Sequence, residues 1–160
     1  MNQLRTAFAA KYAPSIQAIC KATGLFVSVM LAQALIESAN KEGVPGGGDL
    51  AAKHNNFFGI KPDHHWNGER CTLQAHDGPH GELIPQQFCS FSSPEECFKY
   101  RIQFLRENHN YTAAGVFIAK TPEAQAMALQ NAGYAGHGNI TYAPMIIGVI
   151  NGSNLKQYDV

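Results

Sequence analysis

The sequence LFVSVMLAQALIES, residues 25–38, is the stretch that decides the fold. Residues 26–38 predict a helix that is apolar on almost every side, and such helices lie in the middle of a domain. The longest near-apolar part, residues 25–36, is interrupted by Ser28 and Gln33 and is too short to cross a bilayer. We therefore expect a core helix and no membrane insertion.

The segments around this helix predict a single, mainly helical α+β domain that covers residues 1–160. Residues 3–23 are expected to be helical, with Pro14 in the first turn of a second segment and Gly24 as the stop. Alternating segments at 70–74 and 83–91 predict a hairpin-like β excursion. A glycine-rich loop is expected over 40–48. Further helices are expected over 49–53, 93–108, 121–131 and 142–151.

Composition is that of an ordinary globular protein, expected to be monomeric when free. The chain has 160 residues, of which 45% are hydrophobic and 15% charged, with a formal net charge of zero. A balanced charge offers no broad basic face, so nucleic acid is not an expected partner. The N-terminus lacks the basic stretch and apolar run of a signal peptide, so we expect no secretory address in this chain.

Four cysteines stand at positions 20, 71, 89 and 97, with no CxxC pair. The spacing argues against a zinc ribbon or a thioredoxin-type motif. Three disulfide pairings are open, and Cys71 with Cys89 is the easiest to form because the two flank the predicted hairpin. The alternative is four reduced, buried thiols.

Glu37 is the candidate catalytic acid. It ends the apolar helix, where burial disfavours the ionised carboxylate and raises its pKa. A carboxyl group that is neutral near physiological pH is what a glycosidase needs to protonate the departing oxygen. Gln33, one turn earlier on the same face, is expected to hydrogen-bond it. The alternative is a helix-end glutamate that reaches solvent, and periodicity alone favours that alternative.

Three segments occur in order along the chain: LAQALIES at 31–38, NNFFGIK at 55–61, and GYA at 133–135 followed by Tyr142. Together they resemble the bacterial peptidoglycan N-acetylglucosaminidase family, glycoside hydrolase family 73, which includes flagellar muramidase-like domains and autolysins. The resemblance runs from about residue 12 to residue 150. It implies a lysozyme-like fold, with a helical lobe, a small β lobe across a cleft, and no cofactor.

The resemblance also implies site residues. The catalytic glutamate of the family falls on Glu37, and a tyrosine beside the reaction centre falls on Tyr134. Asparagine amides would bind acetamido and hydroxyl groups, and aromatic rings would offer flat faces to sugars, whereas Phe58 is expected in the core. The expected substrate-binding residues are Gln33, Asn55, Asn56, Phe57, Gly59, Trp66 and Tyr142.

A second carboxylate is less defined. Glycosidases normally use two carboxyl groups. The β excursion offers Glu69, Asp77 and Glu82, of which Asp77 lies nearest the place that the family implies, with Glu82 second. The alternative is that all three are solvated charges and that the acetamido oxygen of the substrate acts as the nucleophile.

The chain departs from the family pattern at three places. Ser38-Ala39-Asn40-Lys41 stands where the family has Ser-Gly-Trp-Gly, Cys89 replaces an arginine, and Gly136-His137 replaces Thr-Asp. These changes indicate a divergent branch with a reshaped cleft.

Other chemistries are less well supported by the sequence. His64, His65, His76 and His80 cluster around the β excursion, but no HExxH motif occurs, so we expect solvent-facing histidines and no metal. The sequence has no GxSxG elbow either.

The predicted reaction is hydrolysis of the N-acetylglucosaminyl-β-1,4-N-acetylmuramic acid bond of peptidoglycan. A lone catalytic domain without wall-anchoring repeats or signal peptide suits a toxin that a type VI secretion system injects into a neighbour's periplasm, with an immunity protein that blocks the cleft. This role ranks ahead of a phage endolysin or autolysin. A muramidase, a lytic transglycosylase, a non-catalytic sugar-binding module and a metal-dependent peptidase are the alternatives.

Overall fold

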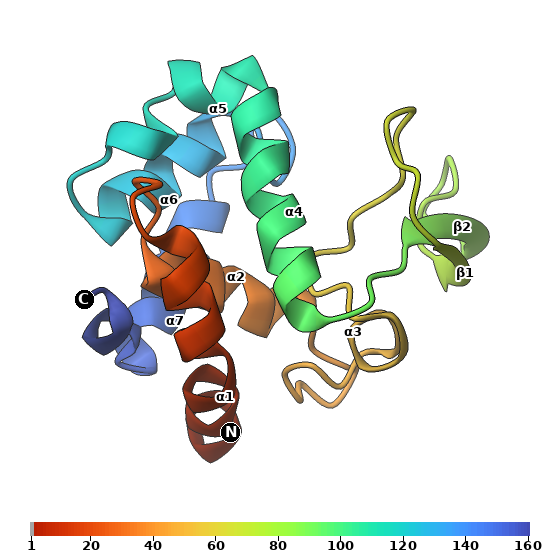
Figure 1. Cartoon of the computed structure of the whole chain (residues 1–160). Helices are drawn as coiled ribbons and strands as arrows, with labels where there is room; N and C mark the ends of the chain where they lie inside the picture. The colour runs from red at the N-terminus through yellow and green to blue at the C-terminus, as the bar shows by residue number, and fades with distance from the viewer. Residues whose placement is uncertain (1) are drawn as a thin grey trace.

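Figure 1 shows the computed structural model, which describes residues 2–160. The architecture confirms the expected mainly helical α+β domain with one small β-hairpin. The helices are α1 (Asn2–Cys20), α2 (Val27–Glu37), α3 (Asp49–His54), α4 (Pro94–Glu107), α5 (His109–Ala113), α6 (Pro122–Asn131) and α7 (Tyr142–Gly152). Strands β1 (Arg70–Ala75) and β2 (Ile84–Cys89) form the hairpin, and two 3-10 turns, η1 (Val116–Ile118) and η2 (Leu155–Tyr158), complete the fold.

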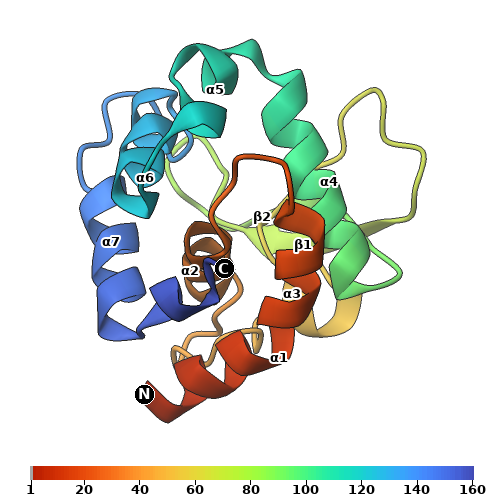
Figure 2. The same cartoon turned by 60° about the vertical axis from the view of Figure 1, so that its left-hand side comes forward.

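Helix α2 is the core of the domain, as predicted from its sequence. All residues from Val27 to Leu35 are buried. Figure 2 shows α2 in the middle, with α1, α4, α6 and α7 arranged around it, and it packs directly against α1, α6, α7 and η2. The apolar side chains along the middle of α2 thus face other helices, and the two ends of the helix reach cavities.

The N-terminus of α2 is capped by the C-terminal tail. The side chain of Phe26, at the N-cap, cannot accept a hydrogen bond. Asp159 takes that role, because its carboxylate accepts the Ser28 backbone N–H at 2.7 Å and the Ser28 hydroxyl at 2.6 Å. A carboxylate at this end satisfies free N–H groups and complements the positive end of the helix dipole.

The N-terminal region differs from the expectation in two ways. Helix α1 continues through Pro14 without a break, so the predicted second segment is wrong. A proline costs a helix one backbone hydrogen bond, and here the helix tolerates that loss. The helix also ends at Cys20 rather than residue 23, and a turn leads to Gly24.

Gly24 occupies a position that a side chain cannot share. Its φ is +82°, and an added Cβ would lie 2.2 Å from the carbonyl oxygen of Phe117. We expect Gly24→Ala to lower the free energy of unfolding by about 2 kcal/mol, measured by urea denaturation. The matched control is Gly148→Ala in α7, where a Cβ would meet nothing within 4 Å. That change should instead add about 0.5–1 kcal/mol of stability through helix propensity. Equal effects of the two changes would contradict the close approach of residues 24 and 117.

Most element boundaries match the sequence prediction, and two of the caps behave as the motifs imply. Ser93 accepts the Glu96 N–H at the start of α4, and Thr121 accepts the Ala124 N–H at the start of α6. Three short elements, α5, η1 and η2, were not predicted. They have three to five residues each, too few to show an apolar period.

The register of the hairpin argues against the pairing of Cys71 with Cys89, the easiest of the three open pairings. Strand β1 pairs antiparallel with β2 so that Arg70 opposes Cys89 and Cys71 opposes Phe88. Cys71 and Cys89 are therefore one register position apart and face opposite sides of the sheet. All four cysteines are free thiols. Burial raises the pKa of the Cys20, Cys89 and Cys97 thiols to about 12.

The hairpin is attached to the loop after α3. The Cys89 N–H donates to the Ile60 carbonyl at 2.9 Å, and the Phe91 N–H donates to the His54 carbonyl at 2.9 Å. Figure 1 shows the hairpin at the right, apart from α5, α6 and α7. Between residues 2 and 160, no helix has the length and apolar character to span a membrane.

Candidate active site

A cavity of about 550 Å³ opens at the C-terminal end of α2. Its walls come from residues 58–61, from α4 and α5, and from the segment 134–145. Among the residues described, Glu37 is the only carboxylate that lines it. The fold therefore places the predicted catalytic acid at the C-terminal end of the buried helix α2, where the helix reaches the cavity.

Glu37 has the electrostatic character expected of a proton donor. Its side chain is open to solvent on the cavity side, but the surrounding walls displace much of the water that would stabilise a carboxylate. This desolvation raises the pKa of Glu37 to about 7, although the charge of Arg101 and a hydrogen bond from Tyr134 act in the opposite direction. The predicted raised pKa is confirmed.

Tyr134 lies beside Glu37, as the resemblance implied. Its hydroxyl group donates to Glu37 Oε1 at 3.0 Å and lies 3.3 Å from Oε2. Burial raises the pKa of the Tyr134 hydroxyl well above its ordinary value. The tyrosine therefore stays protonated and remains a donor whether Glu37 is neutral or ionised.

Gln33 does not occupy the predicted position. Its Nε2 donates to the Tyr142 hydroxyl at 2.6 Å, and its Oε1 accepts from Arg101 Nη2 at 3.2 Å. With 2% of its surface exposed, Gln33 lies beneath the cavity and has no free face for a sugar. The predicted hydrogen bond to Glu37 and the predicted substrate contact are both wrong. Gln33 instead supports two residues that line the cavity.

The structure makes both Phe57 and Phe58 core residues, and of the two only Phe58 also lines the cavity. Phe57 is 2% exposed and packs against the rings of Phe8, Tyr12 and Phe98, so the predicted sugar platform is a core residue. Phe58 is a core residue, as predicted, and its ring also lines the cavity. The direction of this loop is set by Asn55, whose left-handed backbone (φ 53°) ends α3. A motif alone does not say which of two adjacent phenylalanines then reaches the cavity.

The two asparagines hold the loop rather than reach into the cavity. Asn56 is 1% exposed, and its amide donates to the carbonyls of Ile60 and Cys89, both at 2.9 Å. Asn55 donates to the Phe91 carbonyl at 3.0 Å. Asn56 is too deeply buried to contact an acetamido group, and Asn55 does not line the cavity. The expected sugar contacts of both residues are therefore wrong.

Gly59 and Tyr142 line the cavity, whereas Trp66 does not. Tyr142 lies with its ring centroid 5.2 Å from that of Tyr134. Trp66 packs edge-on against Phe91 and Tyr100. The Trp66 ring therefore belongs to an aromatic cluster at the base of the hairpin.

None of the three carboxylates of the β excursion lines the cavity, and the two favoured ones, Asp77 and Glu82, lie on the connection between the strands. Asp77 Oδ2 accepts from Lys61 Nζ at 2.7 Å, and Lys61 itself lines the cavity. Glu82 instead accepts the backbone N–H of His80 at 2.8 Å. Asp77 is thus connected to the cavity by one residue, and Glu82 is turned toward the tip of its own loop.

Arg101 is the site residue that sequence reasoning missed. It lies on α4, is 1% exposed and lines the cavity, with its Cζ 4.2 Å from the Tyr134 ring centroid. A signal was present, because Arg101 falls in phase with the apolar stripe of α4. The buried residues of α4 are Cys97, Phe98, Arg101, Ile102 and Leu105. A charged residue in such a stripe has to be explained by a partner or by function.

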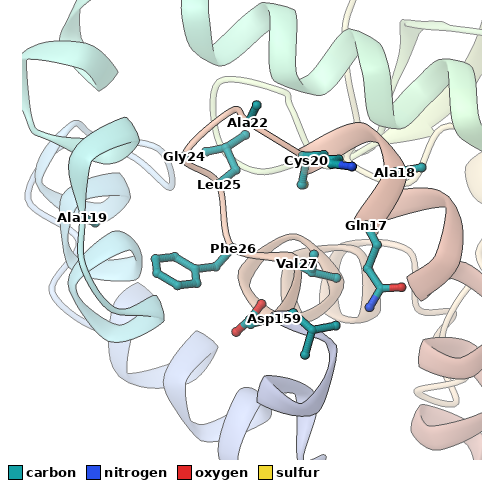
Figure 3. Close-up of a pocket in the computed structure, with 12 residues that line it drawn as sticks. Gln17, Ala18, Cys20, Ala22, Gly24, Leu25, Phe26, Val27, Ala119 and Asp159 are labelled. Atoms are coloured by element: carbon teal, nitrogen blue, oxygen red, sulfur yellow. The ribbon is translucent and has the colours of Figure 1, made fainter.

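A larger cavity of about 660 Å³ lies between the turn after α1, the start of α2 and the C-terminus. Figure 3 shows this cavity, with Asp159 beside Val27 at the start of α2. The Asp159 carboxylate is already bound to Ser28. The smaller cavity is therefore the candidate site, because it alone combines an acid of raised pKa with a hydroxyl donor.

The histidines form no constellation with the other potential ligands. In the part of the chain that the structure describes, no three histidine, cysteine, aspartate or glutamate side chains lie close enough to hold a metal ion. His64 and His65 stack on each other with ring centroids 3.8 Å apart and are exposed.

Comparisons with known proteins agree with this geometry. The glucosaminidase family model, described as mannosyl-glycoprotein endo-beta-N-acetylglucosaminidase, matches residues 13–155. The peptidoglycan hydrolase FlgJ of Pseudomonas aeruginosa is 30% identical over 130 residues, which are 80% of this chain and 32% of FlgJ. FlgJ of Vibrio parahaemolyticus is 31% identical over 85% of this chain and 43% of its own length. The chain therefore spans less than half the length of these relatives.

Solved structures extend the similarity to the fold. The catalytic domain of the autolysin Auto from Listeria monocytogenes superposes with a TM-score of 0.77 at 26% identity, over 98% of this chain and 88% of that domain. A type VI secretion system effector–immunity complex from Pseudomonas protegens has a TM-score of 0.58 at 24% identity, over 94% of both chains. The second likeness is one of fold alone.

Proposed function

The chain belongs to the glucosaminidase family, and we propose that it hydrolyses the glycan backbone of peptidoglycan at the N-acetylglucosaminyl-β-1,4-N-acetylmuramic acid bond. The observation that carries the proposal is Glu37, held at the end of a buried helix with a pKa of about 7 and a hydroxyl donor on its carboxylate. Near neutral pH about half of such groups hold a proton, which is the form that a glycosidase requires.

In the proposed reaction Glu37 gives its proton to the glycosidic oxygen as the bond from that oxygen to C1 breaks. The electron pair of the broken bond stays on the departing oxygen. Water then adds its oxygen to C1, and one proton of that water restores the protonated Glu37. Tyr134 keeps the Glu37 carboxylate oriented and stabilises the charge that it acquires, because an O–H donor on an ionised acceptor forms one of the stronger hydrogen bonds.

For the second carboxylate we favour Asp77, which is joined to the cavity wall through Lys61. Asp77→Asn is expected to lower kcat by at least about tenfold, whereas Glu82→Gln should stay within about twofold of the parent protein. Both rates can be measured as release of reducing sugar ends. Unchanged kcat in Asp77→Asn would exclude Asp77 and favour the acetamido oxygen of the substrate as the nucleophile.

Product analysis tests which bond is cut. Purified peptidoglycan would be digested, reduced with borohydride, and the fragments identified by mass spectrometry. Reduced N-acetylglucosamine ends are expected. Reduced muramic acid ends would make the protein a muramidase, and anhydro-muramic acid ends would make it a lytic transglycosylase.

The biological setting that we propose is attack on the wall of another bacterium from within its periplasm, with an immunity protein that covers the cavity. The support is the fold shared with a chain of a type VI secretion system effector–immunity complex. Expression in a Gram-negative host tests this setting. Lysis should require export to the periplasm and should disappear with Glu37→Gln; lysis from the cytoplasm alone would contradict it.

A further inference from the structure

Arg101 is a buried cation without an anionic partner. In residues 2–160 its guanidinium forms no ion pair with a carboxylate. Nη2 donates to Gln33 Oε1 at 3.2 Å, while Nε and Nη1 are buried and make no hydrogen bond to the described residues. A buried charge that is only partly satisfied is costly. Its presence beside the candidate acid therefore calls for a function.

The positive charge of Arg101 is stabilised by the faces of three aromatic rings instead of by a carboxylate. The Arg101 Cζ lies 4.2 Å from the ring centroid of Tyr134, 5.2 Å from that of Phe58 and 5.8 Å from that of Phe104. A guanidinium within about 6 Å of a ring is attracted by the electrons of its face. The nearest of the three rings belongs to the tyrosine whose hydroxyl donates to Glu37.

The Arg101 guanidinium thus contacts the Tyr134 ring, and the hydroxyl of the same tyrosine contacts the Glu37 carboxylate. A positive charge on the face of a phenol draws electron density from the ring and makes the hydroxyl a stronger donor. The Gln33 amide accepts from the other side of the guanidinium and is itself held by its bond to the Tyr142 hydroxyl, so the cation cannot turn away without losing its hydrogen bond to Gln33.

We propose that Arg101 is a positioning residue for the catalytic acid: its guanidinium holds the ring of Tyr134 in place and strengthens the hydrogen bond from Tyr134 to Glu37. The inference rests on the proposed function, because it assigns Arg101 a role in the same reaction. Arg101 acts through Tyr134 and through its charge, and it does not itself touch the reacting bond.

The groups around Glu37 make Arg101 the main source of positive charge. Lys61 also lines the cavity, but its ammonium group is bound to Asp77. The remaining titratable groups are neutral thiol or phenol groups with a raised pKa. They come from α4, α5, the segment after α6, and α7, and are Cys97, Tyr111, Tyr134 and Tyr142.

Arg101→Met tests the proposal, because methionine fills space without charge. We expect kcat on soluble glycan strands to fall by about 10- to 100-fold, with KM changed less than about twofold. The alkaline limb of the pH–rate profile should also move up by about one pH unit, because loss of a nearby positive charge disfavours the carboxylate. A merely structural residue would not move that limb, so an unchanged limb in the folded variant would overturn the proposal.

Two further variants separate the ring contact from the charge. Arg101→Lys keeps the charge but lacks the planar guanidinium, so kcat should fall while the alkaline limb stays within about half a pH unit of the parent. Tyr134→Phe removes the hydroxyl through which Arg101 acts, so Arg101→Met should cost less in that background than in the parent. Full kcat in Arg101→Lys, or additive effects in the double variant, would contradict the proposal. The lysine variant also decides the case if Arg101→Met does not fold.

The controls distinguish this inference from the proposed function. Parent protein that releases no reducing ends from peptidoglycan would refute the function itself. Active parent protein, inactive Glu37→Gln and an unchanged pH profile in Arg101→Met would leave the function standing and remove only the role of Arg101.

Discussion

Glu37→Gln is expected to lower the rate of glycan cleavage by about 1000-fold, the largest effect of any single change in this chain. General acid catalysis contributes about 10²–10⁴ to a rate, and no other carboxylate among the described residues lines the cavity to take over the proton transfer. Glutamine has nearly the same shape and can still accept the hydrogen bond from Tyr134. The variant should therefore keep the fold and the sugar-binding surface while losing the proton.

The matched control is Glu42→Gln, which makes the same chemical change in the loop after α2. The Glu42 side chain is 58% exposed and forms only a long contact with Lys41, so its rate should equal that of the parent. Reducing-end release and a pull-down on insoluble peptidoglycan would be measured for both variants. If the parent binds the glycan but does not cut it, and Glu37→Gln binds equally well, the chain is a sugar-binding module and not an enzyme.

The fold could be predicted in large part because its signals are local. Residues 25–38 show an apolar helix directly, and a serine or threonine followed by proline marks where α4 and α6 begin. The continuation of α1 through Pro14 was not predictable, since it depends on packing that offsets a lost hydrogen bond. The cap that Asp159 provides for α2 joins residues 131 positions apart and leaves no local pattern.

Only part of the site could be predicted, because a sequence motif gives residue types but not the direction of each side chain. Glu37 and Tyr134 were identified through the family resemblance, since periodicity alone favoured a solvent-exposed Glu37, and the structure brings both residues to the cavity. Gln33 and Phe57 were misassigned because the motif gives residue types but not directions: one turn of helix separates Gln33 from Glu37, and a single peptide bond separates Phe57 from Phe58. Arg101 was missed although its place in an apolar stripe marked it as unusual.

The pH dependence of the reaction gives a second large effect. The pKa of Glu37 is about 7, raised mainly by desolvation, and the acid must be protonated to act. The sign follows: kcat/KM should be level below about pH 6 and fall tenfold per unit above pH 7, to about one hundredth of the plateau at pH 9. The kcat limb should lie at higher pH than the kcat/KM limb, because bound substrate removes further water from the cavity.

Folding stability provides an independent check on the same group. A carboxyl group whose pKa rises from 4.5 in the unfolded chain to about 7 in the folded protein favours folding most fully below pH 4.5, and that contribution is lost as the pH rises through 7. Glu37→Gln does not titrate, so its Tm should rise relative to the parent between pH 4.5 and pH 7, where the carboxyl group is ionised in the unfolded chain and still protonated in the folded one. A Tm difference that stays constant over this range, together with kcat/KM that is level to pH 9, would show that Glu37 ionises at its ordinary pH. The desolvated cavity could then not be what makes this residue an acid.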